Sequence, residues 1–159
     1  MIDAGTRFEI EDLYAEYVRL LDDGPLEQWP ELFVEACLYL VVPRENHDAG
    51  LPLAIMRCES RGMLRDRVRA VQETIMHEPR YLRHHVTQIR SRPGPDESAF
   101  EVTAHFSVIE VLQDALPRVL SVGRYLDRLT RDDDGALRFV TKQVVYDSEM
   151  VPNTIVYPL

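Results

Sequence analysis

Histidine and carboxylate side chains are the residues of this sequence that could perform general acid–base chemistry. An imidazole titrates near neutral pH and can abstract a proton when a carboxylate orients it. His84 or His85, together with Asp127, is the combination that could do so. The two histidines are adjacent, so on a strand they would point to opposite faces of a sheet. The alternative is that they belong to an interior polar network or contact a partner chain.

Metal chemistry needs ligand sets that the sequence does not offer. A Rieske [2Fe–2S] centre is held by two Cys and two His, in Cys-x-His and Cys-x-x-His pairs, and neither Cys37 nor Cys58 begins such a pair. A non-haem iron site takes two His and one carboxylate from one face. No H-x-x-x-H or H-x-E spacing occurs among the histidines, which are His47, His77, His84, His85 and His105. We therefore expect no cofactor-binding or metal-binding residue in this chain.

The composition is that of a globular chain and excludes several classes of partner. The length of 159 residues predicts one domain over residues 1–159. A formal charge of −9 argues against nucleic acid and against an anionic membrane surface. We expect no secretory leader and no membrane span, because the basic and long apolar segments they need are missing. Cys37 and Cys58 are predicted to be free buried thiols in a reducing cytoplasm.

The first half of the sequence predicts three helices and two short strands. Thr6 and Glu9 fit a capping box, and a helical apolar stripe follows until Gly24-Pro25. A short helical piece at 26–33 and a helix that Ser60 caps, ended by Pro79, complete the set. The stripe of the first helix is Ile10, Leu13, Tyr14, Tyr17, Val18 and Leu21, and that of the third is Leu64, Val68, Val71, Gln72 and Ile75. Residues 37–42 and 53–58 are predicted strands, with a loop at 43–52 between them.

The second half predicts long antiparallel strands. Phe100, Val102, Ala104, Phe106 and Val108 alternate strictly and should share one buried face. Residues 119–130 and 137–146 should form two more strands, joined by a hairpin in which Gly135 takes a positive φ. Early helices and a late curled sheet make an α+β domain.

Three segments of the sequence carry a family resemblance. They are Pro43-Arg44-Glu45-Asn46-His47-Asp48-Ala49-Gly50-Leu51, Gly62-Met63-Leu64-Arg65-Asp66-Arg67-Val68 and Asp147-Ser148-Glu149-Met150-Val151-Pro152-Asn153. In this order they resemble the small (beta) subunits of Rieske-type aromatic-ring-hydroxylating dioxygenases. The small subunits of salicylate hydroxylase, anthranilate and terephthalate oxygenases are the most similar.

The resemblance implies a fold, a role and partners. The fold would be the nuclear-transport-factor-2-like (SnoaL-like) cone, with three helices packed on a strongly curved antiparallel or mixed sheet. The role would be that of a non-catalytic structural subunit in a cytoplasmic hexamer of three large and three small chains. The large (alpha) subunit would carry the Rieske [2Fe–2S] cluster and mononuclear non-haem Fe(II), and would hydroxylate an aromatic acid such as salicylate. Alternatives are a stand-alone cone-fold dehydratase or isomerase and a small-molecule binding module.

Charged residues within the family-like segments are the candidates for subunit contacts. The loop at 43–52 and the arginine-rich start of the third helix are either solvated or intramolecularly paired surfaces, or docking surfaces. The apolar tail at 151–159 should be buried against its own sheet or in an interface. The predicted interface residues are Arg44, Glu45, Asn46, His47, Arg65, Asp66, Arg67 and Tyr157.

Overall fold

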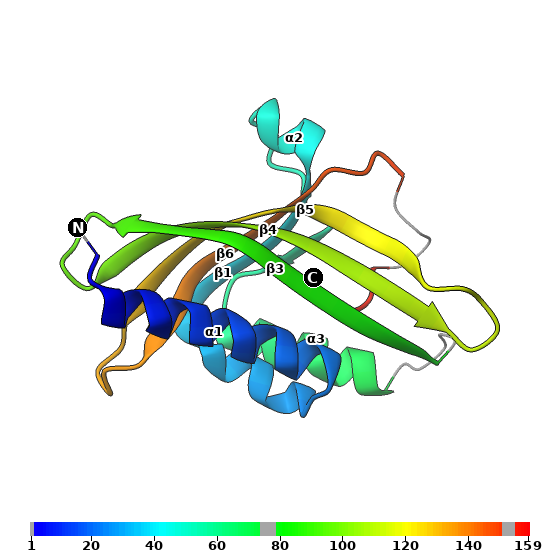
Figure 1. Cartoon of the computed structure of the whole chain (residues 1–159), viewed down its shortest axis with the longest axis horizontal. Helices are drawn as coiled ribbons and strands as arrows, with labels where there is room; N and C mark the ends of the chain where they lie inside the picture. The colour runs from blue at the N-terminus through cyan, green and yellow to red at the C-terminus, as the bar shows by residue number, and fades with distance from the viewer. Residues whose placement is uncertain (1, 74–78, 151–154) are drawn as a thin grey trace.

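The computed structural model describes residues 2–73, 79–150 and 155–159 and centres on a curved six-stranded sheet (Figure 1). The strand order is β2-β1-β6-β5-β4-β3. The strands are β1 (Phe33–Pro43), β2 (Met56–Cys58), β3 (Arg80–Pro93), β4 (Ala99–Leu112), β5 (Arg118–Arg131) and β6 (Leu137–Tyr146). Neighbours pair antiparallel except β1 and β6, which run parallel. The α+β class with a mixed sheet is confirmed.

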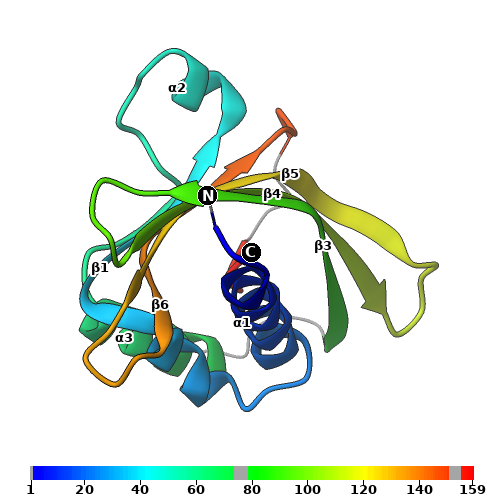
Figure 2. The ribbon, with the colours of Figure 1, turned by 60° about the vertical axis from the view of Figure 1, so that its left-hand side comes forward.

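Helix α1 (Ala4–Asp22) lies in the hollow of the sheet, whose strands wrap around it (Figure 2). Its predicted apolar stripe is confirmed, because Ile10, Tyr14 and Tyr17 are almost fully buried. The predicted capping box at Thr6 is wrong. Asp3 is the N-cap, and its carboxylate accepts hydrogen bonds from the backbone amide and the hydroxyl of Thr6. A carboxylate one turn earlier is the better cap, since it also complements the helix dipole.

The 3-10 helix η1 (Leu26–Leu32) and helix α3 (Arg61–Glu73) pack beside each other below the sheet (Figure 1). The predicted Ser60 cap is confirmed, since its hydroxyl accepts from the Met63 amide at 3.2 Å. Leu64, Val68 and Val71 are buried as expected. Gln72 is exposed instead, because its amide donates to Glu27 of η1 rather than entering the core. Ile75 and His77 lie outside the described residues.

The predicted loop at 43–52 contains the short helix α2 (Arg44–Asp48). Pro43 precedes it with extended backbone, and Gly50 with φ +66° follows it. The helix stands on the opposite side of the sheet from α1 and α3 (Figures 1 and 2). The preceding strand β1 is longer than predicted, whereas β2 is limited to three residues. The segment between β1 and β2 therefore does not extend either strand. It projects from the sheet, with Leu51 and Leu53 exposed.

The long strands β4, β5 and β6 match the predicted ones closely. The inward residues of β4 alternate as expected, and Gly135 takes φ +81° in the β5–β6 hairpin. Irregularities interrupt the register in β3 between Thr87 and Arg90, and between β5 and β6 near Leu129. An extra residue in one strand shifts every later side chain to the other face. These bulges decide which polar residues point inward.

Candidate functional site

The interior of the sheet holds a buried ion pair between Asp127 of β5 and Lys142 of β6. The two residues are directly opposite each other, and Lys142 Nζ donates to Asp127 Oδ2 at 2.8 Å. Both side chains are completely shielded from solvent. The Tyr14 hydroxyl also donates to Asp127 Oδ2, and the Gln143 amide donates to Oδ1 at 3.2 Å. The carboxylate is therefore fully engaged by three donors.

Aromatic rings enclose the ammonium group of Lys142. Its Nζ lies 3.4 Å from the ring centroid of Tyr125 and 4.5 Å from that of Tyr17. Tyr125 in turn stacks on Phe106 with 4.6 Å between ring centroids. Ring faces carry negative potential and stabilise a desolvated cation. The arrangement holds a charge inside the core, where neither Lys142 nor Asp127 is accessible to solvent.

Burial shifts the pKa values of the pair toward the neutral forms. Burial lowers the pKa of Lys142 to about 8, against the opposing pull of Asp127. Burial likewise raises the pKa of Asp127, although Lys142, Tyr14 and the Gln143 amide oppose that shift. The pKa of Tyr14 is raised, first by burial and then by the nearby Asp127. Desolvation is the leading cause in each case.

His84 and Asp127 do not form the acid–base pair that the sequence suggested. His84 is buried, and its Nδ1 lies 2.6 Å from Asp22 Oδ1 at the end of α1, while its Nε2 has no hydrogen-bond partner in the described residues. His85 is exposed on the other face of β3. The predicted opposite orientations are thus confirmed, and no hydrogen bond in the described chain joins either imidazole to Asp127. His84 serves to tie β3 to α1.

The C-terminal segment packs into the interior of the sheet, where it contacts two buried tyrosines. Leu159 is 1% exposed, and its backbone oxygen accepts from the hydroxyls of Tyr17 at 2.6 Å and Tyr39 at 3.2 Å. The Leu159 amide donates to the Tyr39 hydroxyl at 2.9 Å. The space left beside this segment is about 10 Å³, whereas a benzene-sized ligand needs about 150 Å³. The predicted burial of the tail against its own sheet is confirmed for residues 155–159.

The thiols and histidines do not form a metal centre within the described ranges. No group of three or more His, Cys, Asp or Glu side chains there could hold a metal ion. Cys37 and Cys58 are free and buried. Burial raises the pKa of the Cys37 thiol to about 11 and also raises that of Cys58. The described residues therefore do not present the two Cys and two His that a Rieske cluster takes. No helix in the described parts of the chain is long and apolar enough to cross a membrane.

The predicted interface residues lie on two sides of the molecule. On α2, Arg44 pairs with Asp48 and Asp147, His47 contacts Asp48, and Asn46 donates to the Leu53 carbonyl. Their neighbour Glu45 is exposed and near a groove of about 420 Å³.

The remaining members of that set belong to α3 and the C-terminal segment. Arg65 pairs with Glu31 at 2.7 Å, Asp66 is exposed, and Arg67 is half-buried. Tyr157 is half-buried against the core. The structure does not bring the α2 and α3 groups into one surface, since α2 and α3 stand on opposite sides of the sheet (Figure 1).

Lys142 is the residue that sequence reasoning missed. It is the only lysine of the chain and stands in the otherwise apolar run of β6. A single lysine within an apolar strand could have indicated a buried charge with an acidic partner. Strict alternation from Leu137 and Phe139 would place it outward, but the bulge before it turns it inward opposite Asp127.

Comparisons with known proteins agree along almost the whole chain. The family described as "Ring hydroxylating beta subunit" matches residues 16–153. The anthranilate 1,2-dioxygenase small subunit of Burkholderia cepacia is 34% identical over 157 residues, which are 99% of this chain and 96% of that protein. A terephthalate 1,2-dioxygenase terminal oxygenase subunit, beta 2, of Comamonas sp is 31% identical over 95% of this chain and 97% of its own length.

Solved structures show the same agreement. A protein described as the beta subunit of an aromatic-ring-hydroxylating dioxygenase from Novosphingobium aromaticivorans superposes with a TM-score of 0.85 and 35% identity, covering 96% of this chain and 95% of that one. ActVI-ORFA from Streptomyces coelicolor superposes with a TM-score of 0.74 at 16% identity, covering 94% of this chain and all of its own. The second likeness concerns the fold alone. Together they confirm the expected cone, shared by these subunits and by more distant proteins.

Proposed function

The chain belongs to the ring hydroxylating beta subunit family, and we propose that it is the non-catalytic, structural subunit of its oxygenase. As a small subunit of an aromatic-ring dioxygenase, it takes part in an oxidoreductase that incorporates O₂ and works with an alpha subunit. The structural role is the part that goes beyond family membership. In this proposal the small chain supports assembly of the complex, and the alpha subunit carries out the reaction.

The filled cone interior is the observation that carries this proposal. A cone-fold enzyme needs a hollow with an available base. Here Asp127 is saturated by Lys142, Tyr14 and a backbone amide. The His84 ring is held by Asp22 and shielded from solvent, so its free Nε2 is not accessible from outside, and Leu159 packs against Tyr17 in the interior. The same features speak against the stand-alone dehydratase and the binding module. The side chains that would do chemistry instead stabilise the scaffold.

We assign the redox groups and the substrate to the large subunit. It would carry the Rieske [2Fe–2S] cluster and the mononuclear Fe(II), for which this chain has no suitable donor set in its described residues. The relatives act, by their names, on anthranilate and terephthalate, both aromatic acids. An aromatic acid, with salicylate as the specific candidate, is therefore the substrate class we propose. Free, buried Cys37 and Cys58 suit a reducing cytoplasm.

The proposed assembly is a hexamer of three large and three small chains, with each small chain acting as one domain over residues 1–159. Its small chains would form a homotrimer, and α2 with its neighbours would provide one contact surface. Glu45 is exposed and has no ion pair in the described residues, whereas Arg44, Asn46 and His47 are held in place by local bonds. A preorganised projection loses little entropy on binding. On the helical side, Arg65, Asp66 and Arg67 of α3 are the second candidate surface, and Tyr157 of the C-terminal segment is a further candidate contact.

Reconstitution with the large chain tests the proposed role. The purified small chain is mixed with the large chain encoded in the same genome, and sedimentation velocity measures the complex. We expect a single species with three copies of each chain. The Arg44→Glu and Arg65→Glu variants should reduce its fraction, while Arg57→Glu, an exposed arginine of β2, serves as the control. Separate sedimentation of the wild-type chains would refute the proposal.

A further inference from the structure

Three arginines without an ion pair gather at one end of β3. Most basic side chains of the described structure contact a carboxylate, as Arg83 does with Asp23 and Arg92 with Glu101. Arg7 of α1, Arg90 of β3 and Arg128 of β5 form no ion pair there, and all three are exposed. In a chain of net charge −9, a local group of unpaired cations is unexpected.

Two adjoining grooves contain these side chains. The first, of about 550 Å³, runs across the outer face over β3, β4, β5 and β6. Its lining includes Arg90, Arg92 and Arg128, the hydroxyl residue Thr103, and a single acidic side chain exposed to it, Glu101. The Asp127 carboxylate is turned inward to Lys142 and is not exposed.

The second groove, of about 320 Å³, lies at the sheet edge between α1 and β3. Arg7 and Glu11 line it on the helix, and Arg90 and Ser91 belong to both grooves. Cations therefore exceed anions along the joined surface, which we call the arginine groove (Arg7, Arg90, Arg92 and Arg128).

A bulge in β3 creates this arrangement. Gln88 has φ +53°, and the pairing with β4 shifts between Thr87 and Arg90. A residue other than glycine with positive φ is energetically costly and is retained where the surrounding structure requires it. The extra residue turns Ile89 toward the core and Arg90 outward opposite Thr103. Without it, the alternation from Thr87 would direct Arg90 inward.

The charge pattern of the outer face identifies the kind of occupant. The acidic side chain that lines the groove on this face, Glu101, is already neutralised by Arg92, and Asp48 by Arg44 and Arg124, while Glu45, which forms no ion pair in the described part of the chain, lines a separate groove at α2. A second copy that met this one groove to groove would thus bring arginine against arginine. A shallow groove open across four strands also buries little of a small ligand. Both points favour an extended segment of a different chain with free carboxylates, since arginine pairs with carboxylates in two-pronged geometry.

We propose that the arginine groove is the docking site for an acidic segment of the large oxygenase subunit. This inference rests on the proposed function and specifies where and by what chemistry the large chain binds. The carboxylates of that segment contact Arg90 and Arg128 on the outer face and Arg7 at the edge. Attraction between such charges accelerates association and is weakened by salt.

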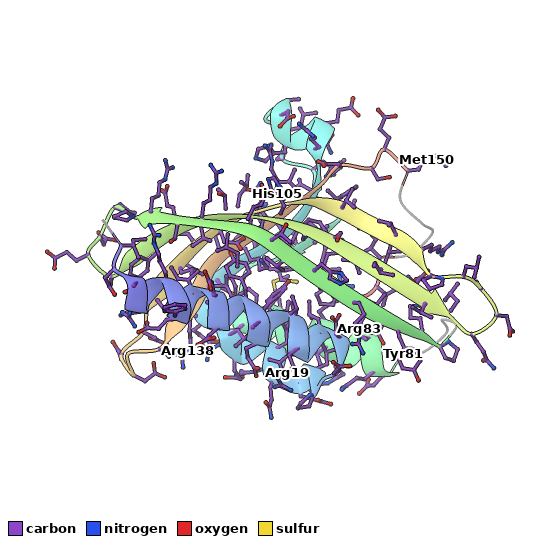
Figure 3. The ribbon with its side chains drawn as sticks, in the orientation of Figure 1. Arg19, Tyr81, Arg83, His105, Arg138 and Met150 are labelled. Carbon is purple, nitrogen blue, oxygen red and sulfur yellow. The ribbon has the colours of Figure 1, made fainter. Side chains whose placement is uncertain are left out.

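Charge reversal tests the docking site. Arg90→Glu/Arg128→Glu is compared with Arg19→Glu, an exposed arginine of α1 on the helical side of the sheet, opposite the face that His105 marks (Figure 3). Circular dichroism first verifies that each variant is folded. Biolayer interferometry then measures affinity for the immobilised large chain at low and high salt. We expect the double variant to lose about tenfold or more in affinity and most of its salt dependence, and Arg19→Glu to bind like the wild type.

The other outcomes would overturn the inference in distinguishable ways. Equal binding of wild type and double variant refutes the groove but leaves the structural role intact. Failure of the wild type to bind refutes both. Self-association of the isolated chain that the double variant abolishes, measured by sedimentation, would identify a second copy as the occupant. Binding of benzoate or inorganic phosphate to the isolated chain, lost in the double variant and measured by calorimetry, would identify a small anion.

Discussion

At the scale of residues, one ion pair and a set of tyrosines stabilise the interior of the cone. Lys142 and Asp127 are both buried completely, so the attraction between them offsets the loss of hydration that each charge suffers in the core. The hydroxyls of Tyr14, Tyr17 and Tyr39 then satisfy Asp127 and the backbone of Leu159. Asp127 and these hydroxyls are thus engaged in stabilising the fold, which supports the non-catalytic role that we propose.

Removing one member of the pair should destabilise the chain strongly. Lys142→Met leaves the Asp127 carboxylate buried without its counter-ion, and we expect a loss of about 3–5 kcal/mol in the free energy of unfolding. The double variant Asp127→Asn/Lys142→Met keeps an acceptor for Tyr14 and removes both charges, so it should recover much of that loss. Urea denaturation measures the wild type, the two single variants Lys142→Met and Asp127→Asn, and the double variant. Additive losses in the double variant would show that the pair is not coupled.

Alkaline pH should also reduce stability, through the buried phenols. Burial raises the pKa of Tyr14, Tyr17, Tyr39 and Tyr125 above the ordinary value of 10.0. The folded chain keeps these protons where the unfolded chain has lost them, so their contribution is complete below pH 10 and falls as pH rises further. The lowered pKa of Lys142 acts in the opposite direction, because it increases stability as pH rises from about 8 to 10.5. Lys142 is one group, whereas four phenols reduce stability at higher pH.

Tyrosinate absorbance checks this pH dependence. The four buried phenols should ionise only together with unfolding, which circular dichroism follows in the same samples. Ionisation of all tyrosines near pH 10 in a folded chain would contradict their burial.

At the scale of elements, the close approach of strands β5 and β6 depends on a glycine. Gly123 of β5 lies opposite Phe106 and Tyr146. A Cβ atom placed there would overlap the Val145 carbonyl oxygen and approach Tyr146 Cα to 2.8 Å. The strand β6 can therefore lie this close only because position 123 has no side chain.

Gly123→Ala should accordingly destabilise the sheet by about 3 kcal/mol or more, since the obstacle is backbone and cannot move aside. Gly62→Ala is the matched control, because its nearest neighbour would be the Ser60 hydroxyl at 3.6 Å, an ordinary contact, and it lies within α3. We expect the control to be neutral or stabilising by up to about 1 kcal/mol. Thermal unfolding compares the two. Equal stability of both variants would argue against the described β5–β6 contact.

The elements that the sequence predicted well are those with regular periodicity. The stripe of α1 and the alternation of β4 follow directly from the spacing of apolar residues. The bulges were not predictable in this way, because an extra residue is indistinguishable from its neighbours in composition. They explain why Lys142 points inward and Arg90 outward. The partners of His84 were likewise hidden, since Asp22 lies 62 residues away in sequence.

At the scale of the whole molecule, the two sides of the sheet serve different ends. The inner face wraps α1 and leaves about 10 Å³ beside the C-terminal segment. The outer face is open, bears the α2 projection and contains the arginine groove (Figure 2). A molecule filled inside and unpartnered outside is suited to holding other chains in place.

Partition of iron and turnover between the two subunits tests this account most directly. The small chain, the large chain and the reconstituted complex are purified separately, and each is assayed for bound iron and for oxygen consumption with an aromatic acid, a reductase and a ferredoxin. We expect all iron in the large chain, no turnover by the small chain, and full turnover in the complex. Stoichiometric iron or substrate-dependent oxygen consumption in the isolated small chain would contradict the account.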